Sequence, residues 1–116
     1  MSQTSPRPAT VPTDEADSDF ARLSAGVVRF YLSALQRGDD ASAMSALDPS
    51  HPRTLSEKSF IDATLRIGKL DAHGTGDSAT VEVDLTTSRG AYFEQFTLRR
   101  LPSGAGVITE HTFIRP

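Results

Sequence analysis

Tyr31 is the first side chain in this sequence whose type and position are suited to chemistry. A phenol that is held in place can donate a hydrogen bond to an oxygen on which negative charge develops. The same position also suits simple packing, because Tyr31 continues an apolar helical stripe and can keep its hydroxyl at the rim of a core. Both interpretations stay open from the sequence.

Glu94 is the second candidate, because strict alternation places it on an aromatic strand face. The residues that share this face are Tyr92, Phe96 and Leu98. A carboxylate among aromatic rings is desolvated, which raises its pKa towards a value useful for a general base. A β-bulge, an edge position or pairing with an arginine would instead turn Glu94 away from this role.

His111 is the third candidate, since an imidazole transfers protons near neutral pH. Alternation predicts two faces for its strand, one with Val107, Thr109, His111 and Phe113, and one with Ile108, Glu110, Thr112 and Ile114. Neither face is decisively apolar. A dimer contact or a solvated rim is therefore an alternative to a catalytic place for His111.

Other residues of reactive types lack the spacing that chemistry needs. Glu82 and Asp84 alternate with valines and a leucine, so we expect them on the wetter face of a strand. His51 and His73 have no partner at metal-ligand spacing, and cysteine is absent. No phosphate-binding glycine loop or nucleophile elbow is present. We therefore expect no metal and no cofactor.

The first half of the chain has helical periodicity. It predicts a helix over Phe20–Gly38, with Thr13 or Asp17 as its N-cap and an apolar stripe on one side. The members of that stripe are Phe20, Leu23, Val27, Phe30, Tyr31 and Ala34. A short helix over Ala41–Leu47 follows, capped by Asp39 or Asp40.

A second long helix is expected over Leu55–Ile67. Thr54 and Glu57 have the spacing of a capping box, in which each side chain satisfies a free backbone amide, and Gly68 ends the helix. The apolar side of this helix comprises Phe60, Ala63, Thr64 and Ile67.

From residue 69 the pattern changes to strands joined by turns. The expected strands are Lys69–His73, Ala79–Thr87, Ala91–Leu101 and Val107–Arg115. Short turns between them predict an antiparallel meander, so the fold class is α+β, with N-terminal helices packed on a curved antiparallel sheet.

Composition sets the remaining limits. The chain has 116 residues, enough for one domain, which we place at 14–116 after a flexible tail rich in proline, serine and threonine at 1–13. The net charge of −3 and the lack of a basic cluster argue against nucleic-acid binding. No apolar run or signal-like start indicates a membrane or an export route, so we expect a cytoplasmic protein.

Three segments carry a resemblance to a known family: Val27–Leu47, with its Gly38-Asp39 break, Leu55–Leu70 and Gly106–Pro116. Together they resemble the nuclear-transport-factor-2-like superfamily, also called cystatin-like, ketosteroid-isomerase-like or SnoaL-like. The resemblance implies a cone-shaped α+β barrel that opens into a ligand pocket, and a homodimer through the outer sheet face. Phe93 and Leu101 lie on that outer face.

The resemblance also implies roles for particular residues. In the ketosteroid-isomerase branch, a tyrosine seven residues before the glycine of Gly-Asp stabilises an oxyanion, and Tyr31 and Gly38 have this spacing. The implied pocket is lined by Val27, Tyr31, Phe60, Tyr92, Glu94 and Phe96. The chain is shorter than the enzymes of the superfamily, and there is no room after Leu47 for the strand pair that often carries a catalytic aspartate.

Two functional hypotheses follow. The first is a non-catalytic, dimeric domain that binds a small apolar or amphipathic ligand or a protein partner. The second is an isomerase, cyclase or hydrolase in which Tyr31 acts with Glu94 or His111 in acid–base chemistry.

Overall fold

The computed structural model describes residues 10–51 and 54–115. Its elements, in chain order, are the helices α1 (Thr10–Arg37) and α2 (Asp40–Ser45), the 3₁₀ turn η1 (Lys58–Phe60), and the strands β1 (Arg66–Thr75), β2 (Ser78–Thr87), β3 (Gly90–Arg100) and β4 (Gly106–Ile114).

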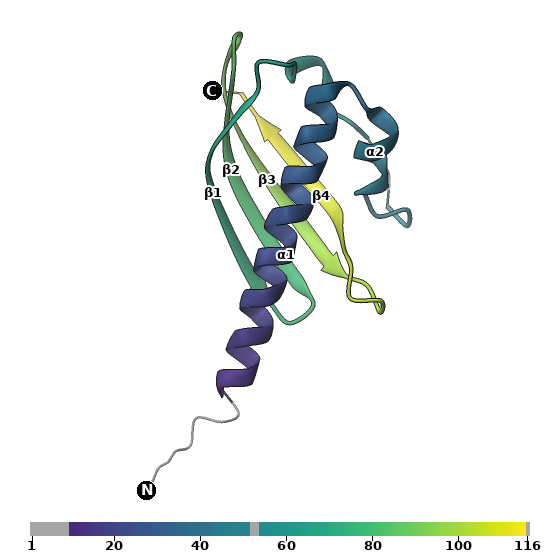
Figure 1. The fold of residues 1–116 in the computed structure, drawn as a ribbon, viewed down its shortest axis with the longest axis vertical. Coiled ribbons are helices and arrows are strands. Elements are labelled where there is room, and N and C mark those ends of the chain that lie inside the picture. The colour runs from purple at the N-terminus through teal and green to yellow at the C-terminus, as the bar shows by residue number, and fades with distance from the viewer. Residues whose placement is uncertain (1–9, 52–53, 116) are drawn as a thin grey trace, which may run out of the picture.

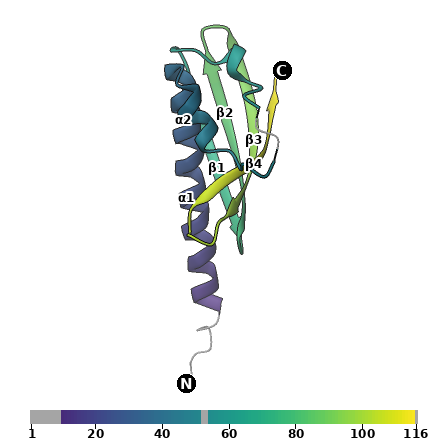
Figure 2. The same ribbon diagram turned by 90° about the vertical axis from the view of Figure 1, so that its right-hand side faces the viewer.

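The four strands form one antiparallel meander in the order β1-β2-β3-β4. Figures 1 and 2 show α1 lying along one face of this sheet, with α2 beside its C-terminal end, so the molecule has two layers. The predicted α+β class, helices first and a curved antiparallel sheet second, is confirmed.

The helix α1 is longer than predicted and is rotated relative to the expected stripe. Its buried residues are Phe20, Ser24, Val28, Tyr31, Leu32, Ala34 and Leu35, whereas Leu23 and Phe30 are 38% and 47% exposed. Apolar residues cover more than one side of this helix, and contact with the sheet selects which side is buried. The predicted tail of residues 1–13 overlaps α1 at its last four residues, and residues 1–9 lie outside the described part.

The break after α1 follows the sequence closely. Gly38 adopts a positive φ of 74°, which glycine accepts without strain and which ends the helix. The carboxylate of Asp39 then accepts a hydrogen bond from the Ser42 amide at 3.1 Å and caps α2. After α2 the chain pairs with β4: Ile108 donates its amide to the Ala46 carbonyl and accepts from the Asp48 amide, each at 2.8 Å.

The second long helix predicted over Leu55–Ile67 is wrong. Only the single turn η1 is helical there, and β1 already begins at Arg66, three residues before the predicted strand. The capping box is wrong too, because Glu57 makes no side-chain cap hydrogen bond and its side chain is buried. The carboxylate is used by tertiary partners instead, so local pattern is overridden by tertiary contacts.

The two faces predicted for β4 agree with the structure from Glu110 to Ile114, but they are wrong for Val107 and Ile108, which precede a bulge. Thr97 pairs with Glu110 and Leu98 with Ile108, so Thr109 is the extra residue. The bulge shifts the phase, so that Ile108 and His111 both face the helix layer.

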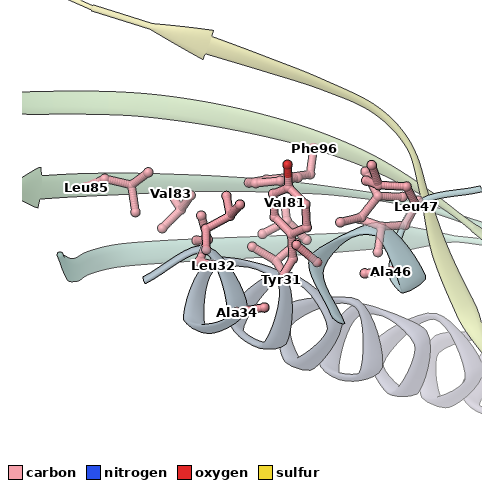
Figure 3. Close-up of a cluster of buried hydrophobic side chains, with 14 of the residues drawn as sticks. Tyr31, Leu32, Ala34, Ala46, Leu47, Val81, Val83, Leu85 and Phe96 are labelled. Atoms are coloured by element: carbon pink, nitrogen blue, oxygen red, sulfur yellow. The ribbon is translucent and has the colours of Figure 1, made fainter. Parts of the chain in front are cut away.

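The core lies between α1, α2 and the inner face of the sheet (Figure 3). Tyr31 and Leu32 project from α1 towards Val81, Val83 and Phe96. Within the described residues, no helix is long and apolar enough to cross a membrane.

Candidate functional site

Four ionisable side chains from four separate segments meet inside the core. They are Tyr31 of α1, Glu57 of the turn before η1, Glu94 of β3 and His111 of β4, and we call them the proton-sharing cluster. The first three are fully buried, and the His111 side chain is 8% exposed. A buried set of such groups is unusual and is a candidate site on physical grounds.

His111 joins the two carboxylates. Its Nδ1 lies 3.1 Å from Oε2 of Glu57 and 3.1 Å from Oε2 of Glu94. Its Nε2 lies 3.0 Å from the carbonyl oxygen of Thr54, to which it can only donate. With a proton on each nitrogen, the imidazolium ring satisfies all three contacts.

Tyr31 completes the cluster from the helix side. Its hydroxyl donates a hydrogen bond of 2.8 Å to Oε1 of Glu57. Its ring packs edge-on against Phe96 and His111, with centroids 5.8 and 5.6 Å apart, while His111 stacks on Phe96. The aromatic contacts fix where the hydroxyl and the imidazole lie.

The surroundings separate the pKa values of the two carboxyl groups. Burial, together with the charge of Glu57, raises the pKa of Glu94 to about 9, against a partial opposing effect of His111. Burial also acts to raise the pKa of Glu57, but hydrogen bonds from His111 and Glu94 outweigh it and lower that pKa to about 2.

The other two members have raised pKa values. Burial alone would lower the pKa of His111, but the two carboxyl groups outweigh burial and raise it to about 10. Burial and the charge of Glu57 hold the pKa of Tyr31 far above its usual value. At neutral pH the cluster therefore contains an imidazolium, one carboxylate, one protonated carboxyl group and a neutral phenol, with no net charge.

One carboxyl oxygen of Glu94 makes no hydrogen bond within the described structure. This oxygen, Oε1, is buried and has no hydrogen-bond partner among the residues that the structure describes. Because an unsatisfied buried polar atom carries a desolvation cost, this oxygen is the point in the cluster where a bound molecule would gain most.

The ligand atoms of Glu57, Glu94 and His111 lie within 4.8 Å of one another, close enough to surround a cation. However, one imidazole nitrogen is shared by both carboxyl groups, and a proton on it already balances the charge of Glu57. We therefore describe the cluster as one that shares protons.

An aromatic group lies next to the cluster, towards the β2–β3 hairpin. Phe113 lies 5.0 Å from Tyr92 and 5.5 Å from Phe60, measured between ring centroids. Tyr92 also borders a surface hollow of about 680 Å³. Of the other predicted pocket residues, Tyr31, Glu94 and Phe96 are buried in the core, and Val27 and Phe60 are half-buried against it.

The remaining candidates lie away from the cluster. Asp84 is exposed and Glu82 is half-buried, and both alternate with the buried residues of β2, as predicted. His51 lies on the surface, with its Nδ1 3.2 Å from Oδ2 of Asp48. A hydrogen bond from Arg99 holds the pKa of Asp48 well below its usual range. His73 is exposed on β1.

The sequence predicted Tyr31, Glu94 and His111 as candidate site residues, and the structure places all three in one cluster. It missed Glu57, which it assigned to a helix cap. The one available signal was weak: Glu57 is an acid in a segment whose apolar residues lack clean helical periodicity.

Comparison with known proteins identifies the fold of this chain. No protein-family model matches the chain. The search of curated proteins found no significant match. Among solved structures, the chain is similar to a cystatin-like fold protein from Burkholderia xenovorans LB400, with 19% identity, a TM-score of 0.66, and coverage of 84% of this chain and 95% of that one. At this identity the likeness shows a cystatin-like fold.

Proposed function

We propose that this protein binds a small organic molecule at the proton-sharing cluster and transfers a proton on it. The observation that carries the proposal is the buried Oε1 of Glu94, which has no partner within the described parts of the chain and lies beside three further proton-exchanging groups. Groups whose pKa values are pushed apart in one place are suited to acid and base roles.

The cluster suits a reaction in which negative charge develops on a substrate oxygen. With its pKa raised to about 9, Glu94 carries its proton at neutral pH and can donate it, and the imidazolium of His111 is a second donor. Such preorganised donors stabilise an enolate-like oxygen. Glu94 thus takes the role of a donor, whereas its role as a base was the expectation from sequence.

Glu57 is the group available to accept a proton from carbon. In the closed cluster its pKa is low because His111 donates to it. When a substrate oxygen accepts the hydrogen bond of His111 in place of Glu57, Glu57 loses one of the contacts that lower its pKa. The pKa of Glu57 therefore rises when substrate is present. Removal of a carbon-bound proton by Glu57 gives a protonated Glu57 and an enolate, and the reverse step returns the proton.

A second candidate is binding without catalysis, as in the first of the two hypotheses from sequence. The complete burial of Tyr31, Glu57 and Glu94 favours it, because a substrate reaches these side chains only when the atoms packed around them move. Membership of the nuclear-transport-factor-2-like superfamily, a homodimer through the outer sheet face and a cytoplasmic location all stay predictions. The cystatin-like fold supports the first of these.

Isotope exchange tests the two candidates together. The protein is incubated in D₂O with a panel of small ketones and keto acids, and loss of the proton α to the carbonyl is followed by NMR. We expect faster exchange with the native chain, loss of exchange in Glu57→Gln, and unchanged exchange in the control Glu82→Gln on the other sheet face.

Thermal shifts on the same panel separate binding from catalysis. A compound that raises the melting temperature but shows no exchange supports binding alone. A panel without shifts and without exchange contradicts both candidates.

A further inference from the structure

The surface hollow next to Tyr92 has a composition that the proton-sharing cluster does not explain. It measures about 680 Å³, within the size range of small-molecule sites, and its lining residues are Arg89, Gly90, Ala91, Tyr92 and Arg115. We call it the arginine hollow. It lies at the β2–β3 hairpin, and Tyr92, which packs with Phe60 and Phe113, is its aromatic lining residue.

Both arginines contact residues that are not among those lining the hollow. Arg89 donates to the carbonyl oxygen of Ser59, and its Nε lies 3.9 Å from a carboxylate oxygen of Asp62. The guanidinium of Arg115 lies 4.8 Å from the centre of the Phe60 ring. Stacked or tethered guanidinium groups lose little freedom when they bind an anion, because they are already oriented.

The charge around the hollow is positive. Arg89 and Arg115 each carry one positive charge, and none of the described residues that line the hollow is acidic, although Asp62 lies near Arg89 outside that lining. Two guanidinium groups and one nearby carboxylate leave a single positive charge in this part of the described structure. That charge matches one monovalent anion, and the planar fork of arginine suits a carboxylate.

We propose that the arginine hollow binds the carboxylate of a small organic acid whose ring lies against the exposed edge of Tyr92, a side chain that is 8% exposed. The proposal names the substrate class of the proposed acid–base function, and to that extent it rests on that function. The expected ligand is a monoanionic aromatic or alicyclic acid.

The position of the hollow relative to the cluster fits such a molecule. Tyr92 and Glu94 are successive inward residues of β3, so their Cα atoms are about 7 Å apart along the strand. Phe113 pairs with Glu94 across the sheet and contacts Tyr92 from the side. A carboxylate at the arginines therefore leaves the remainder of a ring-sized molecule beside Tyr92, one inward position along β3 from Glu94.

Titration of the full chain with 2-naphthoate, followed by amide NMR shifts, tests the proposal. We expect shifts centred on Gly90, Ala91 and Tyr92, and binding at least tenfold weaker for the neutral naphthalene-2-carboxamide. Inorganic phosphate is the third arm. Binding of phosphate as tight as that of naphthoate would contradict a carboxylate site with an apolar wall.

Substitutions of Arg115 and Arg89 test whether these two side chains supply the positive charge that binds the carboxylate. Arg115→Gln should weaken 2-naphthoate binding about tenfold, and Arg115→Lys, which keeps the charge but loses the fork, should lie between Arg115→Gln and the native chain. Arg89→Gln should also weaken binding, although it removes the contact to Ser59 as well. The matched control is Arg66→Gln, an exposed arginine of β1.

Equal affinity for the neutral amide, or unchanged binding in both Arg115→Gln and Arg89→Gln, overturns the anion site. Anion binding is measured here without turnover. Failure of isotope exchange with intact naphthoate binding would therefore count against the acid–base function alone, and the opposite pattern would count against the arginine hollow alone.

Discussion

The hydroxyl of Tyr31 donates a 2.8 Å hydrogen bond to Oε1 of Glu57, and both side chains are fully buried. This contact ties α1 to an irregular segment 26 residues later in the chain. It also gives Glu57 one of the hydrogen bonds that a buried carboxylate needs if it is to stay ionised. The stability of the fold is therefore linked to the charge state of the cluster.

Tyr31→Phe should lower the free energy of unfolding by about 1–2 kcal/mol, because a hydrogen bond to a buried charge is lost while the ring still packs. Urea unfolding at pH 7 measures the effect. Tyr92→Phe is a matched control, since Tyr92 borders the open hollow and its hydroxyl has no hydrogen-bond partner among the described residues. An equal loss in both variants would mean that the contact to Glu57 contributes nothing.

Glu57 and Glu94 should respond differently to the same conservative change. Glu57→Gln removes the counter-charge of a buried imidazolium, and we expect a loss of about 3 kcal/mol at pH 7. Glu94→Gln replaces a carboxyl group that is already neutral, so its loss should stay below about 1 kcal/mol. Denaturant midpoints measured side by side decide this, and the reverse order would show that the charges are assigned to the wrong carboxyl groups.

The free energy of unfolding should decrease as the pH rises above neutrality. Burial raises the pKa of folded Glu94 from 4.5 to about 9, and the hydrogen bonds to Glu57 and Glu94 raise the pKa of folded His111 from 6.5 to about 10. The folded state thus binds more protons than the unfolded chain. The contribution of Glu94 to the free energy of unfolding is complete below pH 4.5 and is lost by about pH 9. The contribution of His111 is complete below pH 6.5 and is lost by about pH 10.

Acid has the opposite effect through Glu57, whose folded pKa of about 2 lies below its ordinary 4.5. Its contribution is present above pH 4.5 and is lost as the pH falls towards 2. Unfolding curves from pH 3 to pH 9 should therefore show a maximum in the mildly acidic range. Glu94→Gln should flatten the alkaline side, and an unchanged slope in this variant would contradict the raised pKa of Glu94.

Ser24→Ala should stabilise the protein by about 1 kcal/mol. The Ser24 side chain is fully buried on α1, and within residues 10–51 and 54–115 its hydroxyl has no hydrogen-bond partner. Alanine removes the unsatisfied group and has the higher helix propensity. Ser33→Ala on the same helix is the control, because its hydroxyl accepts from Arg37 at the surface and little change is expected there. Destabilisation by Ser24→Ala would show that this hydroxyl has an unrecognised partner.

Local sequence signals determined the parts of this protein that depend on neighbouring residues. The turn at Gly38, the cap at Asp39, the alternation along β2 and β3 and the inward position of Glu94 all follow from short-range rules of backbone conformation and strand geometry. These were enough to predict an α+β fold and to bring forward Tyr31, Glu94 and His111.

Tertiary structure alone decided the rest. The segment around Glu57 has a helix-capping pattern, but burial against Tyr31 and His111 gives its carboxylate stronger partners than a helix end offers. The bulge at Thr109 and the rotation of α1, which leaves Phe30 exposed, also depend on packing between distant segments. The four residues of the proton-sharing cluster are separated by up to 80 positions in the chain. Local sequence pattern cannot predict that they share protons, because they come into contact only when the sheet and the helix pack together.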